Sequence, residues 1–418
     1  MTPKNKLTRR AAIKLGLGST AFTAVTSLWT SSLIARPLKD KGKVVVAGAG
    51  AFGGWTALWL LRKGFQVTLV DPFGPGNSQS SSGGETRLIR AFYDKQIYFD
   101  MTLRSIELWK EFDKSVGRPV FHQNGLLVFN HKPQTPETEA ATPLYRKAGL
   151  TLEKISAADA AKRWPQLRTD DLDHVLYDPQ AGYLEARQGC INVCEQFIRE
   201  GGTYIQQKVA KENRSSGKVT SVTLADGRQL EADQFAFACG PWITRLFPSL
   251  TSRIHIHRGV VFFFASPPDK SEWLENKLPT WMDRDHDGPF RPFGVPGSAF
   301  RGFKVGLTPP GDNDITDRFD TYDRMVTAHE IELAQGVLKR RFPAMVGRPL
   351  IETRVCQYTD TPDSDFILDH HPEASNLWIL GGDSGHGYKL GPAFGEMASR
   401  TIAGELAVSR TFELKRLL

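Results

Sequence analysis

The sequence predicts an α/β fold in which the chain returns several times to a parallel sheet and adds a second, more antiparallel region. The first observation is a short Val-rich run, Lys43–Ala47, which is typical of a strand buried on both faces. The second is a helix pattern over Trp55–Lys63, closed by Gly64 where a helix C-cap is expected. The third is another apolar run, Phe65–Val70. Together they predict a complete strand–helix–strand unit.

The remaining elements follow the same alternation. Helices are predicted over Ile97–Phe112, Ser156–Trp164, Arg187–Arg199, Ala328–Phe342 and Ala393–Glu405. Strands are predicted over Gly125–Phe129, within Val209–Leu230, and over Phe235–Ala238, Arg258–Ala265 and Leu377–Leu380. The segment Ser266–Gly297 is rich in Pro, Asp and aromatic residues, and we expect it to form loops over a site. The pattern suggests a doubly wound sheet interleaved with an antiparallel region.

A glycine motif connects the first strand to the first helix. Gly48 permits a tight turn, Gly50 lets the backbone approach a pyrophosphate, and Gly53 lets the helix pack on the strand. The helix N-terminus then offers N–H groups and a positive dipole end to phosphates. Asp71 ends the second strand, where an acid accepts hydrogen bonds from ribose hydroxyls. The motif predicts a dinucleotide cofactor, but it does not separate FAD from NAD.

The distribution of charge along the chain excludes nucleic-acid binding as the main function. The 418 residues carry a formal net charge of +7, with 40% hydrophobic residues. Residues 1–35 hold no acidic residue and supply +5 of this charge through Lys4, Lys6, Arg9, Arg10 and Lys14. The rest of the chain carries about +2 without a basic block, so no nucleic-acid partner is expected.

Residues 1–35 also predict that the protein is exported. Arg9 and Arg10 precede a mildly apolar stretch, Leu15–Ile34, that is diluted by glycines and ends near Ala35. Paired arginines before such a stretch are typical of a twin-arginine signal peptide, here residues 1–35, read by the twin-arginine export machinery. The protein is then periplasmic or exported. A plain N-terminal helix or an uncleaved membrane anchor remains an alternative.

The four cysteines are too few for a disulfide framework in a chain of this length. Cys190 and Cys194 have helical spacing without a His or Cys cluster nearby, so core packing is expected and no metal is predicted.

Three later segments are ambiguous when each is taken alone. Arg87 and Arg90 have the spacing of a solvated helix face, and Cys356 beside a valine is typical of an inert buried thiol. The glycine-rich run 381–389 lies between a strand and a helix, which indicates backbone held close to a ligand.

In combination these segments resemble a known family. GAGAFG, SSGGETRLIR, AFACGPW (236–242), CQYTDTP (356–362), FILDHHPE (366–373) and GDSGHGYKLGP (382–392) occur in this order. Together they resemble the monomeric sarcosine oxidase and N-methyltryptophan oxidase family of D-amino-acid-oxidase-like flavoproteins, from about Lys43 to the C-terminus.

The resemblance implies an α/β fold: a Rossmann-like FAD-binding domain of discontinuous segments and a second, α+β mixed-sheet substrate domain. Residues 42–120, 180–248 and 350–418 are expected in the FAD-binding domain. Residues 121–179 and 249–349 are expected in the substrate-binding domain.

The resemblance also implies roles for individual residues. Cys356 corresponds to a cysteine joined covalently to FAD, and Arg87 to an arginine near the flavin ring. Arg90 and Lys389 correspond to a pair that binds a substrate carboxylate, and Lys304 to a lysine that activates O2. By itself, Lys304 could instead be a strand lysine that faces solvent. Further positions implied at the cofactor or the active site are Thr86, Tyr358, Gly385, His386 and Gly387.

Three positions depart from the family pattern. Thr308 replaces an active-site histidine, Phe293 replaces a tyrosine, and Gly83 replaces another histidine. The flavin residues are retained while polar pocket groups are lost, which leaves the reaction class intact and puts sarcosine itself in doubt.

The implied activity is FAD-dependent oxidation of the C–N bond of a secondary amine or N-alkyl amino acid, by a monomer that passes electrons to O2. Three alternatives stay open. A periplasmic dehydrogenase would pass electrons to a quinone or carrier, a non-catalytic flavin-binding subunit would not be reduced by any amine, and an NAD enzyme fits the later segments poorly.

Overall fold

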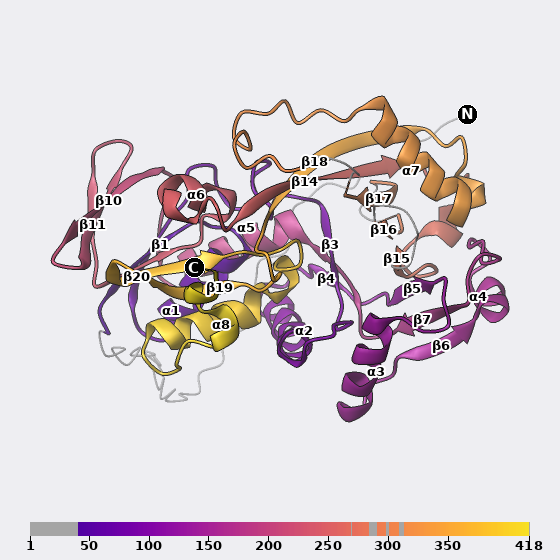
Figure 1. Ribbon diagram of the computed structural model, residues 1–418, viewed down its shortest axis with the longest axis horizontal. Coiled ribbons are helices and arrows are strands. Elements are labelled where there is room, and N and C mark those ends of the chain that lie inside the picture. The colour runs from indigo at the N-terminus through magenta and orange to yellow at the C-terminus, as the bar shows by residue number, and fades with distance from the viewer. Residues whose placement is uncertain (1–40, 269, 284–290, 298–300, 309–312, 418) are drawn as a thin grey trace, which may run out of the picture. The chain divides into compact units, whose positions relative to one another are not determined.

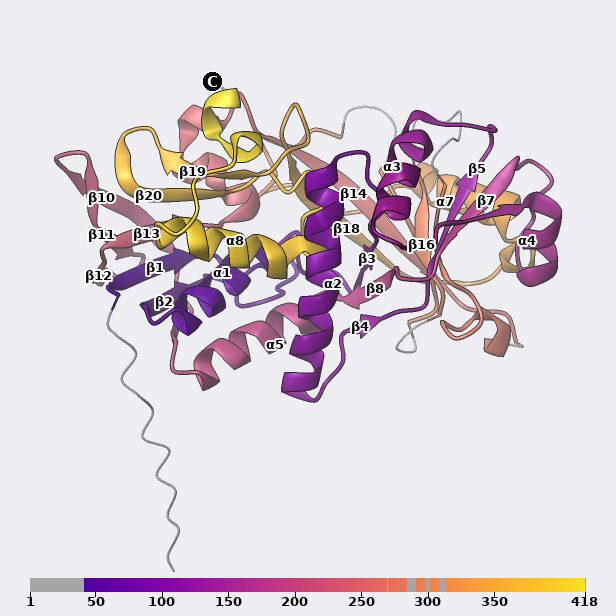
Figure 2. The ribbon, with the colours of Figure 1, turned by 90° about the horizontal axis from the view of Figure 1, so that it is seen from below.

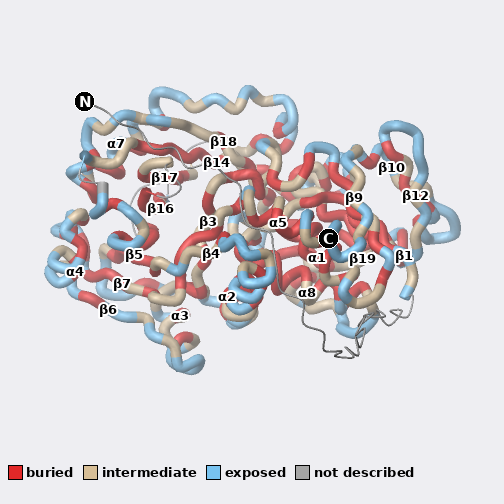
Figure 3. The backbone as a smooth tube through the Cα atoms, turned by 180° about the vertical axis from the view of Figure 1, so that it is seen from behind, coloured by how far each residue is buried: buried red, intermediate tan, exposed pale blue. Residues whose placement is uncertain are grey.

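The computed structural model describes residues 41–268, 270–283, 291–297, 301–308 and 313–417 (Figure 1). The predicted signal peptide lies outside these residues. Two large sheets organise the described chain, and Figure 3 shows that its buried backbone is concentrated in them.

The six-stranded sheet contains the predicted strand–helix–strand unit. Its order is β19 (Ile367–His371), β20 (Ala374–Gly381), β13 (Gln234–Phe237), β1 (Lys43–Ala47), β2 (Gln66–Val70) and β9 (Thr203–Ile205). All neighbouring pairs are parallel except β19–β20 at the edge. Because alternate residues of a strand face opposite sides, Val44 and Val46 join one core cluster and Val45 and Ala47 join another. Both faces are therefore buried, as the Val-rich run predicts.

The two faces are covered differently. One is packed by α1 (Ala51–Arg62), α5 (Ala186–Arg199) and α8 (Gly391–Ile402), which lie together in Figure 2. The other is packed by the short α6 (Ile243–Leu246) and by the sheet of β10 (Val209–Ser215), β11 (Lys218–Leu224) and β12 (Gln229–Glu231). The doubly wound expectation is thus wrong for this second face, because a β-meander supplies its apolar cover.

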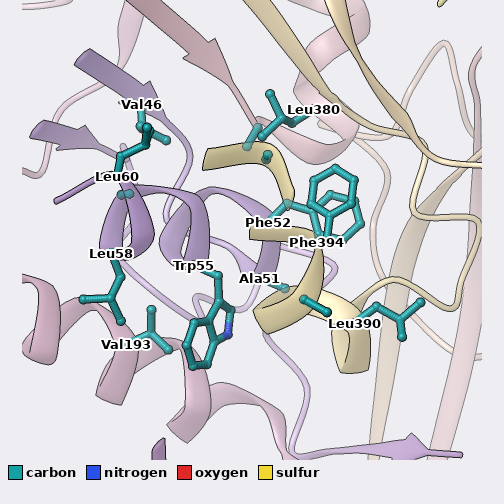
Figure 4. Packing of buried hydrophobic residues seen from close by; sticks show 14 of the residues in the cluster. Val46, Ala51, Phe52, Trp55, Leu58, Leu60, Val193, Leu380, Leu390 and Phe394 are labelled. Atoms are coloured by element: carbon teal, nitrogen blue, oxygen red, sulfur yellow. The ribbon is translucent and has the colours of Figure 1, made fainter. Parts of the chain in front are cut away.

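The helix side is closely packed around α1 (Figure 4). The rings of Phe52 and Phe394 stack with centroids 3.9 Å apart. A Cβ on Gly395 would lie 2.7 Å from the backbone carbonyl carbon of Trp55, so a larger residue would separate α8 from α1. This contact holds the start of α1, which carries the glycine motif.

The second large sheet is mixed. Its order is β18 (Leu350–Asp360), β14 (His255–Phe264), β17 (Phe303–Leu307), β16 (Phe293–Val295), β15 (Thr280–Asp283), β5 (Leu126–Asn130), β7 (His174–Asp178) and β6 (Glu153–Ser156). All its pairs are antiparallel except β15–β5. The expectation of loops throughout Ser266–Gly297 is therefore wrong in part, because β15 and β16 lie within that segment and pair in this sheet.

A small three-stranded sheet and a long helix lie between the two large sheets. The small sheet contains β3 (Thr86–Ile89), β8 (Gly182–Glu185) and β4 (Phe121–His122). The long helix, α2 (Gln96–Val116), runs between them in Figure 2. The remaining helices are α3 (Pro136–Lys147), α4 (Ala157–Arg163) and α7 (Ala328–Arg341), and the short 3₁₀ turns η1 (Gly240–Trp242) and η5 (Tyr388–Leu390) border the site described below. Within the described residues, no helix combines the length and apolarity needed to cross a bilayer.

Candidate functional site

One large cavity of about 1,080 Å³ lies at the carboxyl ends of the parallel strands. Its lining includes Gly48, Gly50 and Asp71 at one end and residues of β14, β17 and β18 at the other. Ligands of open α/β sheets bind at this edge. The volume is at the top of the usual range of about 300–1,000 Å³ for small-molecule sites.

Close backbone packing shapes the glycine loop. Gly48 has φ +105°, and a Cβ there would lie 2.3 Å from the carbonyl oxygen of Ala238. A Cβ on Gly53 would lie 1.9 Å from the carbonyl oxygen of Gly48. Gly50 begins α1 without a side-chain cap, and the first turn of α1 contains no acidic residue. The positive end of α1 therefore faces the cavity without a neutralising carboxylate.

Asp71 organises the same loop. Its carboxylate accepts hydrogen bonds from the backbone N–H of Ala49, Phe73 and Gly74, each 2.9 Å long. Burial raises the pKa of Asp71 and the three backbone bonds oppose that rise. Each carboxylate oxygen accepts more than one hydrogen bond, so these contacts leave capacity for the expected ribose hydroxyls.

Arg87 and Lys304 meet at one backbone carbonyl. Arg87 lies on strand β3, so the expectation of a helix face for this segment is wrong. Its guanidinium donates to the carbonyl oxygens of Thr86 (2.9 Å) and Ser81 (2.7 Å). The Lys304 ammonium donates to the same Thr86 carbonyl (2.9 Å) and to Thr86 Oγ1 (3.1 Å).

Lys304 is a buried cation. Its residue is 2% exposed, which excludes the alternative of a solvent-facing strand lysine. Burial, and then the charge of Arg87, lower the pKa of Lys304 to about 7. The Phe293 ring centroid lies 5.5 Å from its ammonium, within the range of a cation–π contact.

Cys356 and Tyr358 enter the cavity from β18. Cys356 pairs with Gly259 of β14 and lines the cavity. Burial raises the pKa of the Tyr358 hydroxyl to about 12, so Tyr358 is neutral at physiological pH. That hydroxyl lies 3.2 Å from Thr308 Oγ1. Thr308 therefore makes a neutral polar contact where the resemblance implied an imidazole.

Arg90 approaches Lys389 and His386, which lie together in a distant part of the sequence. The Arg90 guanidinium donates to the carbonyl oxygen of Phe92, and the Lys389 ammonium donates to that of His386 at 2.8 Å. Lys389 is 4% exposed. Burial, followed by the charge of Lys389, lowers the pKa of His386 to about 3, so this imidazole is neutral.

The glycine-rich run 381–389 forms the turn between β20 and η5. Gly385 has φ +70°, and a Cβ on Gly387 would lie 2.8 Å from a ring carbon of Phe52. Gly83 is equally constrained, because a Cβ there would lie 1.8 Å from the carbonyl oxygen of Asn77. Any side chain at position 83 would therefore force this loop to shift.

The structure brings almost all of the predicted site residues to this cavity. Its lining contains Gly48, Gly50, Asp71, Arg87, Arg90, Phe293, Lys304, Thr308, Cys356, Tyr358, Gly385, His386, Gly387 and Lys389. Gly53 and Thr86 do not line the cavity. Gly53 lets α1 pack closely on the glycine loop, and the Thr86 carbonyl oxygen accepts hydrogen bonds from Arg87 and Lys304.

Three of the lining residues that sequence reasoning missed contact predicted site elements or carry a shifted pKa. Ser82 accepts a hydrogen bond from the Ala51 N–H at 3.1 Å, and its only signal was a serine-rich loop. Tyr93 lies beside Arg90 and Lys389. Burial raises the pKa of the third, Asp383, to about 6. Among the described residues, no group of three or more His, Cys, Asp or Glu side chains is arranged to hold a metal ion.

A protein-family model described as "FAD dependent oxidoreductase" (DAO) matches residues 43–401. The chain belongs to this family. It is therefore an FAD-dependent oxidoreductase, and the match covers both large sheets.

Curated relatives and solved structures agree with this assignment. Monomeric sarcosine oxidase of Bacillus sp. (strain B-0618) is 29% identical over 85% of this chain and 91% of its own length. N-methyl-L-tryptophan oxidase of Salmonella arizonae is 26% identical over 89% of this chain and 96% of its own length. A crystal structure of a modified fructosyl peptide oxidase from Aspergillus nidulans shares the fold, with a TM-score of 0.75 at 18% identity, covering 89% of this chain and 93% of that one.

The residues present fit FAD. The first turn of α1, the glycine loop and Ser82 form a backbone-lined cradle at one end of the cavity. The same cavity is also lined by Lys304 and Cys356, and its volume suits a dinucleotide.

Proposed function

We propose that this enzyme oxidises the C–N bond of an N-alkyl amino acid or related secondary amine and uses O2 as the electron acceptor. The observation that carries the proposal is the convergence of Arg90, Lys389 and Lys304 on the cofactor cavity. The names of the relatives, sarcosine oxidase and N-methyl-L-tryptophan oxidase, support the same reaction class.

The proposed reaction is an oxidation to an imine followed by hydrolysis. Bound FAD supplies a two-electron acceptor for hydride from the carbon next to nitrogen, and the amine, bound deprotonated, loses its remaining N–H proton as the imine forms. Water hydrolyses the imine to a carbonyl compound and the shorter amine. O2 takes up the two electrons and two protons and leaves as hydrogen peroxide.

Arg90 and Lys389 are the proposed carboxylate anchor. Lys389 is buried, and two cations at one end of a cavity are stabilised when an anion lies between them. Phe293 and Met282 add apolar surface to the same cavity. We therefore favour an aromatic or long-chain N-alkyl amino acid over sarcosine.

Lys304 is the proposed oxygen-activating group. A cation held by Thr86 and shielded from water stabilises negative charge that develops on O2. Tyr358 and Arg87 line the same cavity and are the proposed neighbours of the flavin and the reacting amine. His386 also lines this cavity, beside the proposed carboxylate anchor.

An amine panel tests the reaction. Sarcosine, N-methyl aromatic amino acids, cyclic imino acids and the matching decarboxylated amines are assayed for peroxide, with anaerobic flavin bleaching in parallel. Bleaching by an amino acid with rapid reoxidation in air is expected. Slow reoxidation in air would make the enzyme a dehydrogenase that uses a quinone or carrier, and absence of bleaching by every amine would make it a non-catalytic flavin-binding protein.

We further propose that Cys356 holds FAD covalently. Acid-precipitated protein should remain yellow, and Cys356→Ser should release free FAD. Complete loss of flavin from the denatured wild-type protein would contradict the tether.

The last proposals concern the cell. Residues 1–35 are proposed to direct the enzyme, which we expect to be monomeric, through the twin-arginine route to the periplasm. The double substitution Arg9→Lys and Arg10→Lys should retain the protein in the cytoplasm. Unchanged export of the double variant would exclude this route.

A further inference from the structure

Both cations of the proposed carboxylate anchor contact one aromatic ring. The centroid of the Tyr93 ring lies 5.0 Å from the Arg90 guanidinium carbon and 5.1 Å from the Lys389 ammonium nitrogen. Both distances are within the roughly 6 Å range of cation–π attraction. Tyr93 lines the cavity beside both residues. A single ring therefore connects two charges that are 299 positions apart in the sequence.

His386 fixes the hydroxyl of this ring. Its Nε2 lies 3.0 Å from the Ser364 carbonyl oxygen, and a carbonyl only accepts, so Nε2 carries the proton. The neutral ring then has a lone pair at Nδ1, which accepts from the Tyr93 hydroxyl at 2.9 Å. Both ring nitrogens of His386 are thus used within the protein, and the imidazole acts through Tyr93.

Packing holds the ring from a second direction. Tyr98 stacks on Tyr93, with ring centroids 5.4 Å apart and an interplanar angle of 28°. The Tyr98 hydroxyl donates to Asp365 at 2.9 Å, and Lys95 forms an ion pair with the same carboxylate at 2.8 Å. The orientation of Tyr93 is therefore set by groups on α2 and on the loop between β18 and β19.

We propose that Tyr93 is the positioning residue that sets the separation and direction of Arg90 and Lys389, and thereby makes the enzyme select substrates by their carboxylate. The electron-rich π system of the ring attracts both cations and offsets their mutual repulsion. This inference rests on the proposed function, because it takes the Arg90–Lys389 pair as the carboxylate anchor.

Ligand binding by the holoenzyme tests the proposal without turnover. Phenylacetate and its neutral counterpart phenylacetamide are titrated into the wild type, Tyr93→Phe and Tyr93→Leu, and binding is followed by the flavin absorbance spectrum. Tyr93→Leu removes the ring and should weaken phenylacetate binding about 10-fold. Tyr93→Phe keeps the ring and loses the bond to His386, so about a threefold weakening is expected. Phenylacetamide binding should be unchanged in both variants.

Kinetics and a matched control separate positioning from packing. For the amino-acid substrate, KM should rise in Tyr93→Leu with little change in kcat, whereas KM for the decarboxylated amine should not change. Tyr177 is the matched control, because it lies outside the cavity and its ring centroid is 4.6 Å from the guanidinium carbon of Arg163. Tyr177→Leu should leave KM and kcat unchanged.

The outcomes are distinguishable. Equal weakening of acid and amide in Tyr93→Leu would overturn the positioning role while leaving the carboxylate anchor intact. A wild type that binds phenylacetate no better than phenylacetamide would overturn the anchor itself and, with it, this inference. If Tyr93→Leu does not fold, unchanged phenylacetate binding by Tyr93→Phe overturns the role of the His386 bond.

Discussion

The two ends of the cavity are built by different means. At the nucleotide end, backbone geometry determines the site: Gly48 and Gly53 allow close approach, and Asp71 is held by three N–H groups. At the substrate end, long charged side chains determine it: Lys304 and Lys389 are buried against carbonyl oxygens and aromatic rings. The first end is set by local chain sterics, whereas the second depends on segments that only the tertiary fold brings together.

The largest expected effect is at the nucleotide end. Gly53→Ala places a Cβ 1.9 Å from the Gly48 carbonyl oxygen, so α1 must move away from the loop. We expect the purified variant to contain almost no flavin by absorbance. Gly336→Ala is the matched control, because its Cβ meets nothing within 4 Å in helix α7 and should stabilise the protein by about 0.5–1 kcal/mol. Full flavin content in Gly53→Ala would contradict a sterically determined loop.

The next effect is at the carboxylate anchor. Removing one partner from a buried ion pair costs about 3–5 kcal/mol, so Arg90→Ala should lower kcat/KM for the amino-acid substrate by about 100-fold or more. The decarboxylated amine should be much less affected, because it lacks the anion. Arg163→Ala, which removes an arginine outside the cavity, is the control. If acid and amine are turned over equally well by the wild type, the assignment of Arg90 and Lys389 fails.

Lys304 predicts an effect on oxygen use and on its pH dependence. Lys304→Met should slow reoxidation of the reduced flavin by about 100-fold while leaving its reduction by substrate much less affected. Since the pKa of Lys304 is lowered to about 7, the cation is present below pH 7 and is lost above it. The wild-type reoxidation rate should therefore fall as pH rises through about 7, and the variant should show no such fall.

Stopped-flow measurement of reoxidation against pH checks both statements. Lys110→Met is the matched control, because Lys110 also lies over a phenylalanine ring, at 5.8 Å, but on the surface. An unchanged rate in Lys304→Met would overturn the proposed role of Lys304 in oxygen activation.

The smallest effect concerns Phe293. Its ring favours the protonated form of Lys304, so Phe293→Leu should lower the pKa of Lys304 further. We expect the midpoint of the reoxidation profile to move down by about half a pH unit. A midpoint that moves up would show that the ring disfavours the cation through desolvation alone.

Sequence patterns predicted the nucleotide end and most elements because their causes are local. The spacing of Gly48, Gly50 and Gly53 between two apolar runs predicts a tight strand-to-helix turn, and the structure confirms it. Strands β15 and β16 were not predicted, because their segment has the composition of a loop. Short strands of this kind form only through pairing with strands that are distant in the sequence.

By itself, the sequence determined that this protein has a dinucleotide-binding strand–helix–strand unit and, through its ordered motifs, which family it resembles. Only the tertiary structure decided that Lys304 is buried instead of solvated, that the loop leaves no space for a Cβ at Gly83, and that Tyr93 contacts both Arg90 and Lys389. The physical reason is that a glycine turn is limited by neighbouring atoms in the chain. The protonation and direction of a long cationic side chain depend instead on desolvation, carbonyl oxygens and rings contributed from hundreds of residues away.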